Sequence, residues 1–351
     1  MKRHLIASSV IAALTALAST SALAAEPNFY GRLDLATTHS DTGFTTQNKK
    51  SGTVLENNFS YLGVKGSESI ANGLDIVYQM EFQVENTGLE GNKTPFKARN
   101  TFLGLKTTHG TVLIGRSDPV FKQSEGNVDM FGNTNADIDR LIAGQGRVAD
   151  GIWYYSPKFA DLVTFDATYL MADNYNTSKA QYALGATLGD KGFKAQNYYV
   201  AAAYMDGIEN IEAYRVVGQV KCNDFKFGGV FQHTESQTYA NLEGNTYFVN
   251  AAYYLNGVNL KVQFGQDDSG LGGYIKNLVA AETSTSTDSK AFFEAITDVS
   301  LTNISVGADY RVAKSTLVYG QFAHYSGELS QSSLKTDLDD SVLSVGVRYD
   351  F

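Results

Sequence analysis

Hydrophobic and polar residues alternate one for one in several stretches of the chain, most clearly in residues 343–351. Every second position there is apolar, and the positions between are small or charged. The apolar row is Leu343, Val345, Val347, Tyr349 and Phe351, and the other row is Ser344, Gly346, Arg348 and Asp350. A repeat of two residues places the two rows on opposite faces of a strand. The pattern therefore predicts a strand that separates an apolar environment from a polar one.

The same alternation recurs at residues 74–84, 258–265 and 304–312. In the last two stretches, charged residues stand on the second face, namely Lys261, Asp309 and Arg311. Charged side chains are almost never fully buried unless they are paired. These faces are therefore expected to be wet, which the inner layer of a β-sandwich would not be.

The connectors between the alternating segments differ in length. Seven are short turns, at about residues 67–73, 108–110, 158–161, 189–192, 221–224, 256–257 and 313–315. Eight are longer polar stretches, at about residues 39–52, 86–97, 118–149, 172–178, 205–210, 236–244, 268–303 and 327–339. Together they join sixteen strands. An even number of strands, with short turns at one end and long loops at the other, is typical of a transmembrane β-barrel.

A sheet that spans a membrane has to close on itself, because each unpaired backbone group in hydrocarbon costs several kcal/mol. Sixteen strands enclose a water-filled channel, whereas about eight leave an interior filled by side chains. The predicted fold class is all-β, a closed 16-stranded antiparallel transmembrane β-barrel. A soluble multi-domain β-protein is the alternative, and it explains the alternation but not the asymmetric connectors.

The first residues predict a secretory signal peptide. Lys2 and Arg3 precede an apolar, Ala-rich run over residues 5–17, and Ala22-Leu23-Ala24 offers a cleavage site of small residues. We expect cleavage after Ala24, which divides the chain into a signal peptide (residues 1–24) and a barrel (residues 25–351). A membrane anchor is the poorer interpretation, because Ser and Thr interrupt the run and no stop-transfer segment follows it.

The composition supports a membrane barrel and argues against nucleic acid as a partner. The chain has 21 Tyr, 20 Phe and 33 Gly but only 4 Pro. Without Lys2 and Arg3, 26 basic residues remain against 37 acidic ones, which is a net charge of −11. Nucleic-acid binding needs a basic surface. The single cysteine, Cys222, can form no disulfide within the chain, and its polar surroundings predict a tight turn.

Several motifs, taken in order and with their spacing, resemble those of the general (non-specific) outer-membrane porins of bacteria. They are NFYGRLDLA at residues 28–36, SYLGVKGSESIANGL at 60–74, RNTFLGLK at 99–106, TVLIGR at 111–116, GRVADGIWYYSP at 146–157 and the closing SVGVRYDF. Each motif alone is degenerate, but the resemblance extends over nearly all of residues 25–351.

The resemblance implies a homotrimer in the outer membrane, surrounded by outer-membrane lipid, that lets small hydrophilic solutes and ions diffuse passively through a water-filled channel. In this family the last strand pairs with the first, and the C-terminal aromatic residues are read by the outer-membrane assembly machinery. Here those residues are Tyr349 and Phe351. The third long loop of such porins folds into the lumen, which assigns that position to residues 118–149.

The family's pore is narrowed between basic residues on the barrel wall and acidic residues on the third loop. The basic positions implied here are Arg32, Arg99, Arg116 and Arg147; the acidic ones are Asp129, Asp137 and Asp139. Tyr61 stands where the family often has another wall arginine, and Asn133 where a glutamate is frequent, so a weaker transverse field is expected. The alternative interpretation is that each arginine forms an ordinary lumen salt bridge that supports the loop.

No catalytic, cofactor or metal motif stands out in the sequence. The four histidines after residue 24, His39, His109, His233 and His324, lack metal-ligand spacing, and no G-x-S-x-G or phosphate-binding motif is present. We therefore expect no cofactor, no metal and no enzymatic reaction. The alternative functions are a substrate-selective channel for sugars or anions, a barrel enzyme, and a surface target for adhesion or phage.

Overall fold

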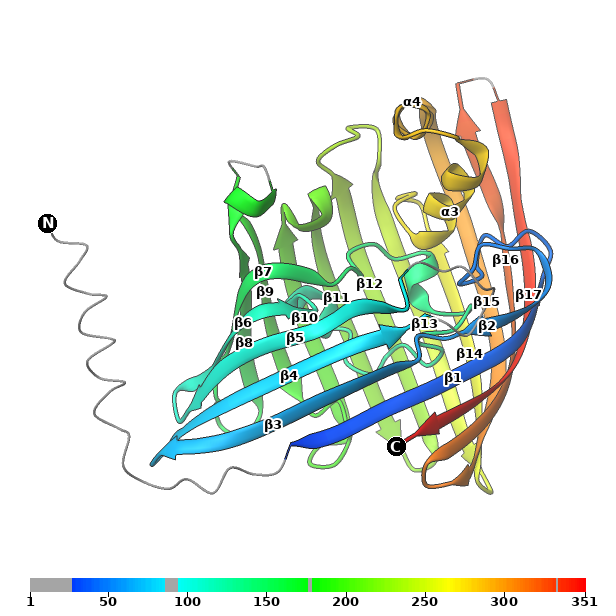
Figure 1. Cartoon of the computed structure of the whole chain (residues 1–351). Coiled ribbons are helices and arrows are strands. Elements are labelled where there is room, and N and C mark those ends of the chain that lie inside the picture. The colour runs from blue at the N-terminus through cyan, green and yellow to red at the C-terminus, as the bar shows by residue number, and fades with distance from the viewer. Residues whose placement is uncertain (1–26, 86–93, 176–178, 333) are drawn as a thin grey trace, which may run out of the picture.

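A computed structural model describes residues 27–85, 94–175, 179–332 and 334–351 of the 351. The predicted signal peptide, residues 1–24, lies outside the described residues. Most of the described chain is β-strand, wound into one antiparallel sheet whose first and last strands are paired (Figure 1). Among the described residues, no helix is both long and apolar enough to cross a bilayer.

The strands follow one another around the barrel in sequence order. Their bounds are β1 (Asn28–Ser40), β2 (Gly52–Asn57), β3 (Tyr61–Ala71), β4 (Leu74–Val84), β5 (Phe96–Thr107), β6 (Gly110–Ser117), β7 (Val148–Tyr155), β8 (Val163–Leu170), β9 (Gln181–Gly189), β10 (Tyr198–Asp206), β11 (Ile211–Cys222), β12 (Phe225–Ser236), β13 (Glu243–Leu255), β14 (Val258–Asp267), β15 (Ile296–Ala313), β16 (Thr316–Gln331) and β17 (Leu334–Asp350).

These seventeen segments form sixteen barrel strands, because β2 and β3 pair in succession with the same strand, β1. The interruption lies at residues 58–60, where Phe59 has a positive φ of 59°. The N–H of Asn58 still donates to the carbonyl of Asp34 (2.9 Å), and the N–H of Asp34 donates to the Ser60 hydroxyl (2.9 Å). The ladder with β1 is therefore bent but not opened, and the predicted sixteen-stranded closed barrel is confirmed.

Closure occurs between β1 and β17, from the pair Arg32 and Asp350 to the pair Ser40 and Val342. On β17 the predicted apolar row points outward: Leu343, Val345, Val347, Tyr349 and Phe351 are all 45% or more exposed. Ser344, in the opposite row, is buried inside. Outward apolar rows and polar inward rows are the arrangement that a lipid-facing barrel requires.

The two ends of the barrel differ as the connectors predicted. The short turns gather at the end where β1 starts and β17 finishes, here called the turn end, and the opposite end is the loop end (Figure 1). Two helices lie in the long connection between β14 and β15 at the loop end, α3 (Gly273–Glu282) and α4 (Ser286–Ala295). The remaining short helices are α2 (Val120–Gln123), η1 (Ile138–Arg140), η2 (Ala172–Tyr175) and η3 (Ile208–Asn210).

Three predicted connectors were too long. The stretches 268–303 and 327–339 are strand over much of their length, because β15 starts at Ile296, β16 runs to Gln331 and β17 starts at Leu334. In these extensions the outward rows are polar, and the apolar residues Val299, Leu301, Leu329 and Leu338 face inward and are buried. The outward apolar row that marks a membrane strand is therefore absent from them. The turn predicted at residues 67–73 is also shorter, since β3 continues to Ala71 and only two residues separate it from β4.

The interior of the barrel holds the segment between β6 and β7, of which residues 119–146 are here called the lumen loop; Asp118 and Arg147, which adjoin the ends of β6 and β7, are counted with the wall. Nine apolar side chains of the loop are 3% exposed or less and pack against the inner wall, while Met130 is partly buried; the nine are Val120, Phe121, Val128, Phe131, Ala136, Ile138, Leu141, Ile142 and Ala143. The predicted position of the third long loop inside the barrel is confirmed. Much of the buried core therefore lies between the loop and the wall, and it continues at the loop end around the buried residues of α3, Tyr274, Ile275, Leu278 and Val279.

Candidate functional site in the barrel lumen

The lumen loop follows one half of the inner wall, and side chains of successive strands hold its backbone. The donors are the Tyr199 hydroxyl to Ser124 O (3.0 Å), Asn250 Nδ2 to Val128 O (2.7 Å), Lys261 Nζ to Met130 O (2.9 Å), Gln263 Nε2 to Ala136 O (3.0 Å) and the Tyr325 hydroxyl to Asn135 O (2.8 Å). These donors belong to β10, β13, β14 and β16. The loop is thus fixed mainly along the β10–β16 side, by hydrogen bonds to carbonyls that would otherwise be buried without partners. Asn135 also donates to Thr38 of β1, Glu56 of β2 and Ser344 of β17.

Arg215 of β11 joins the two legs of the lumen loop. Its guanidinium donates to Phe121 O and to Ala143 O, both at 3.3 Å, and its Nε donates to Gln232 Oε1 (2.8 Å). The Arg215 side chain is completely buried, lies 4.4 Å from the centre of the Phe121 ring and is 3.7 Å from a Glu125 oxygen. Sequence reasoning missed this residue, since its inward position in an alternating strand resembles that of any lumen residue.

The predicted basic residues lie on the wall that the loop leaves free. Arg99 pairs with Glu81 at 2.6 Å, and Arg32 pairs with Asp350 at 2.7 Å. The ring of Tyr61 lies between these two arginines, with its centre 5.0 Å from the Arg99 guanidinium and 5.5 Å from that of Arg32. A tyrosine in place of a further arginine therefore gives both guanidinium groups an aromatic face to stack on.

Arg147 and Arg116 extend this basic group toward β6 and β7. Arg147 lies 3.2 Å from a carboxylate oxygen of Asp118. Burial and the positive charges of Arg99 and Arg116 lower the pKa of Arg147, against the opposing effect of Asp118. The strand register places Arg116 opposite Thr101, two residues from Arg99, and Ser117 opposite Val148, next to Arg147. Arg99, Arg116 and Arg147 are therefore neighbours on the wall, and Arg32 adjoins Arg99 through the Tyr61 ring.

The predicted acidic residues lie on the far stretch of the lumen loop. Asp129 accepts the N–H of Phe131 (2.9 Å), and Asp137 caps η1 by accepting the N–H of Asp139 (2.8 Å). Asp139 pairs with Arg140 at 2.8 Å. Burial, helped by the nearby charges of Asp137 and Glu125, raises the pKa of Asp129 well above its usual range. Burial likewise raises the pKa of Asp139 to about 7 despite its arginine partner.

The basic and acidic groups occupy different sides of the lumen. Within the described ranges, no ion pair joins the three loop acids to the four wall arginines. Each group is instead partly compensated on its own side, by Glu81, Asp118 and Asp350 on the wall and by Arg140 on the loop. Charges of opposite sign on facing sides of a water-filled lumen produce a transverse electric field, and the low-dielectric walls around the lumen focus this field in the water.

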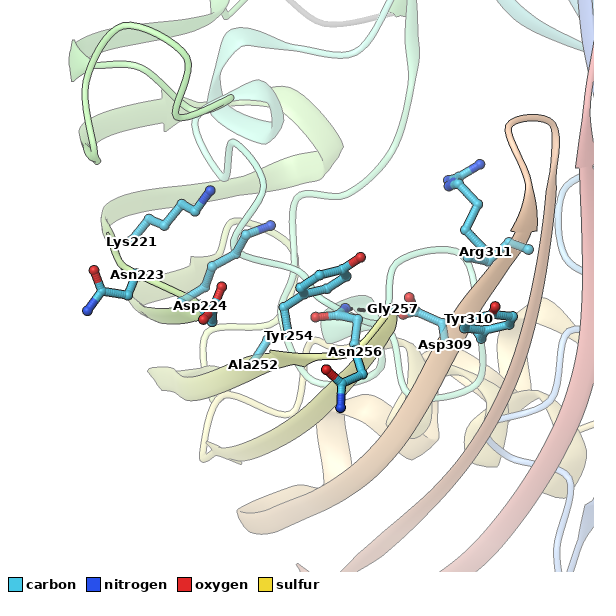
Figure 2. Close-up of a pocket in the computed structure, with 13 residues that line it drawn as sticks. Lys221, Asn223, Asp224, Ala252, Tyr254, Asn256, Gly257, Asp309, Tyr310 and Arg311 are labelled. Atoms are coloured by element: carbon cyan, nitrogen blue, oxygen red, sulfur yellow. Dashed lines mark hydrogen bonds between the residues drawn. The ribbon is translucent and has the colours of Figure 1, made fainter.

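A cavity of about 730 Å³ opens at the turn end of the lumen, at the turns that join β11–β12, β13–β14 and β15–β16. Figure 2 shows Lys221 on one side of it and Arg311 on the other, with Tyr254 between them. Asp309 pairs with Lys261 at 2.9 Å, so the charged faces predicted for these strands are confirmed as lumen faces. The water-accessible space thus continues from the lumen loop to the turn end of the barrel.

Comparisons with known proteins agree with this architecture. A family model described as Gram-negative porin matches residues 7–329. The major outer membrane protein P.IB of Neisseria gonorrhoeae is 24% identical over 302 residues, which cover 77% of this chain and 84% of that protein.

Two solved structures share the fold. The anion-selective porin of Comamonas acidovorans has a TM-score of 0.68 at 17% identity, covering 93% of this chain and 99% of that one. The trimer form of OmpT of Vibrio cholerae has a TM-score of 0.64 at 13% identity, with the same shares covered. The chain therefore belongs to the Gram-negative porin family and is a non-enzymatic diffusion channel of the outer membrane.

Proposed function

We propose that the lumen is a general diffusion pore with weak ion selectivity, set by the wall arginines on one side and the loop acids on the other. The wall arginines are Arg32, Arg99, Arg116 and Arg147, and the loop acids are Asp129, Asp137 and Asp139. One observation carries the proposal: the lumen loop is fastened to the β10–β16 side, which leaves the arginine side uncovered. Solutes then pass between two opposed charged surfaces.

Weak selectivity follows from the compensation within each group. Every wall arginine except Arg116 has a carboxylate partner or an aromatic face, and Asp139 has Arg140. A dense basic funnel, as an anion-selective channel would need, is not supported by this balance. The solved neighbour from Comamonas is described as anion-selective, but at 17% identity it supports the fold alone.

The test is the single-channel conductance of purified protein in a planar bilayer, with the reversal potential in a KCl gradient. We expect an ohmic conductance and a reversal potential close to zero. A reversal potential near the limit for a pure anion or cation channel, or a conductance blocked by a particular sugar, would favour the substrate-selective alternative instead.

We infer that the working assembly is a homotrimer exported by a signal peptide of residues 1–24. Porins of this family are typically trimeric, and the OmpT structure is a trimer form. N-terminal sequencing of the protein from outer membranes should begin at Ala25. Its mass in mild detergent should be three times that of one chain, and a monomer there would contradict the trimer.

The proposed role of Phe351 in assembly has local support. The N–H of Phe351 donates to Gly31 O (3.1 Å) and the N–H of Gly31 to Phe351 O (2.9 Å), so the last residue is paired with β1. Its ring lies across Gly31, where an added Cβ would be 2.3 Å from the nearest ring carbon. Phe351 is 60% exposed, which leaves the rest of the ring available to a partner or to lipid.

Replacing Phe351 by Asp should therefore reduce the amount of folded protein in outer-membrane fractions several-fold, while secretion into the periplasm continues. The matched control is Tyr349→Phe, which keeps the aromatic row intact and should insert like the wild type. The measurement is the heat-resistant trimer on a gel from isolated outer membranes. Equal amounts for Phe351→Asp would refute the proposed signal.

A further inference from the structure

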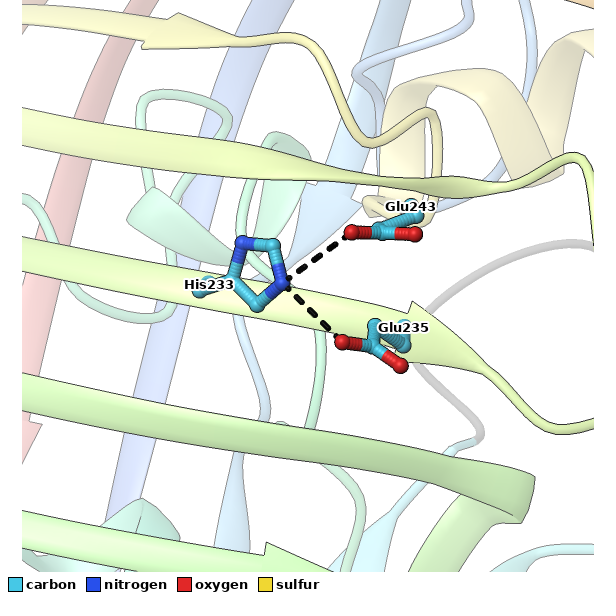
Figure 3. A group of neighbouring side chains, drawn as sticks. All are labelled: His233, Glu235 and Glu243. Atoms are coloured by element: carbon cyan, nitrogen blue, oxygen red, sulfur yellow. Dashed lines mark hydrogen bonds and ion pairs between the residues drawn. The ribbon is translucent and has the colours of Figure 1, made fainter.

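A histidine and two glutamates meet on the outer face of the barrel, away from the pore. His233 and Glu235 are on β12, and Glu243 begins β13. His233 Nε2 is 3.3 Å from an oxygen of Glu235 and 3.5 Å from an oxygen of Glu243 (Figure 3). No motif reveals this cluster in the sequence, because the two carboxylates come from neighbouring strands.

The position of the cluster follows from the strand pattern. Gln232 and Thr234 point into the lumen and are fully buried, so His233 and Glu235 point outward. The cluster is near the loop end, because β12 ends at Ser236. The Tyr214 ring stacks on the His233 imidazole with centres 5.0 Å apart. An outward tyrosine at this height suits the aromatic girdle at a membrane interface, so the cluster lies at the rim, where water and polar headgroups reach it.

The protein alone does not balance the charges of this cluster. In the β12–β13 ladder Glu235 is directly opposite Glu243, and His233 is directly opposite Asn245. Two like charges in directly opposed positions destabilise a strand pair. Within the described part of the chain, no lysine or arginine forms an ion pair with either glutamate. A cation between the two carboxylates would remove this repulsion.

Asn245 orients the imidazole for that role. His233 Nδ1 is 3.0 Å from Asn245 Oδ1, and an amide oxygen can only accept a hydrogen bond. Nδ1 therefore carries a proton, and Nε2, which hydrogen-bonds to a Glu235 oxygen, is the nitrogen that can bind an ion once it gives up its own proton. A metal-bound histidine typically donates its other ring N–H to a neighbouring acceptor in this manner.

We propose that His233 Nε2, Glu235 and Glu243 bind a divalent ion of the Zn²⁺ type. Bonds of about 2.0–2.1 Å in a tetrahedral site put ligand atoms about 3.3 Å apart, close to the observed 3.3 and 3.5 Å. Ca²⁺ and Mg²⁺ prefer oxygen ligands only, so the imidazole favours Zn²⁺. Three protein ligands leave a fourth position for water or an external anion. Bound there, the ion links the ends of β12 and β13.

The experiment is calorimetric titration of untagged, chelator-treated protein in detergent with Zn²⁺. We expect one strong site per chain that excess Mg²⁺ does not displace. His233→Ala should abolish this site, and Glu235→Gln or Glu243→Gln should each weaken it at least about tenfold. Asn245→Ala should weaken it by roughly tenfold, as is typical for partners that orient a ligand.

The matched control is His324→Ala. His324 lies in the β16–β17 pair with a single carboxylate, from Asp339, at 3.9 Å, so this variant should bind Zn²⁺ like the wild type. Heat-resistant trimer on a gel verifies that each variant is folded. The proposal is overturned if the wild type shows no strong site, or if His233→Ala binds as tightly as the wild type. Either result would leave a protonated imidazole between two carboxylates, or zinc bound elsewhere.

Discussion

The two sides of the inner wall use arginine in opposite ways. On the loop-bearing side, Arg215 is completely buried and donates hydrogen bonds to two backbone carbonyls and to the side-chain amide oxygen of Gln232. On the free side, Arg147 and Arg32 pair with carboxylates but keep 18% and 23% of their side chains exposed. The contrast separates two tasks of one residue type: a desolvated guanidinium fixes the loop, and a partly hydrated one presents its charge to the pore.

The largest effect is expected from Arg215→Gln. This change leaves Phe121 O and Ala143 O without their charged donor and Glu125 without its partner. Removing one member of a buried ion pair typically costs about 3–5 kcal/mol, and the loop can lower that cost by leaving the wall. We expect the single-channel conductance to rise and to fluctuate, while the barrel stays folded.

Trypsin provides a second measurement of loop release. The lumen loop contains Lys122 and Arg140, which are protected inside the wild-type barrel and should be cleaved in Arg215→Gln. The matched control is Arg311→Gln, because Arg311 is also a lumen arginine but donates to Lys314 O at the turn end and not to the loop. If conductance and trypsin resistance both stay at wild-type values, the other wall donors hold the loop without Arg215.

An intermediate effect is expected from Arg147→Ser on the free side. The change removes a positive charge and a long side chain, so the pore should become wider and more attractive to cations. A unit charge 8 Å from an ion in water is worth about 0.5 kcal/mol, or roughly a twofold change in local ion ratio. The measurement is the reversal potential in a KCl gradient.

This shift should shrink at 1 M salt, where the Debye length falls to about 3 Å. Arg311→Ser serves as the comparison, because Arg311 borders the 730 Å³ cavity and acts on a wider cross-section. Its shift should be smaller than that of Arg147→Ser. An unchanged reversal potential for Arg147→Ser would mean that Arg147 serves only as the partner of Asp118.

The contrast between outer and inner faces also explains what the sequence could predict. On β17 the outward residues from Leu343 onward meet the same apolar environment, so a repeat of two residues was enough to predict that part of the strand and its lipid-facing row. Barrel closure was predicted from the cost of unpaired backbone groups in hydrocarbon and from the resemblance to porins. The two-residue rule failed at residues 296–303 and 327–339, because the outward rows there are polar and apolar residues such as Val299, Leu329 and Leu338 face inward. An outward row of apolar residues marks only the part of a strand that faces lipid.

The lumen depends on contacts that have no repeat. The length of residues 118–149 and the resemblance to porins predicted that this loop lies inside, but its path is set by single donors such as Asn250, Lys261 and Gln263. Each is far from the loop in sequence, and each looks like any polar lumen residue. The resemblance to porins predicted the wall arginines. The role of Arg215 depends on the positions of Phe121 O and Ala143 O in the two legs of the loop, which only the structure shows.

The smallest effect is expected from Asp129→Asn, and it should depend on pH. Burial and the charges of Asp137 and Glu125 raise the pKa of Asp129, so this carboxyl keeps its proton to a higher pH than an ordinary aspartate does. The substitution should therefore move the reversal potential toward anions, and by more at about pH 8 than at about pH 5. Its effect is smaller than that of Arg147→Ser because the pore width changes little.

Asp190→Asn is the control for this pH dependence. Hydrogen bonds from the backbone N–H groups of Ala195, Gly192 and Lys194 lower the pKa of Asp190 to about 2, so this turn-end carboxylate is charged at both pH values. Any shift caused by Asp190→Asn should then be the same at about pH 5 and about pH 8. If Asp129→Asn also gave equal shifts, its carboxyl would be ionised throughout, and the loop would present a fixed negative charge to the wall arginines.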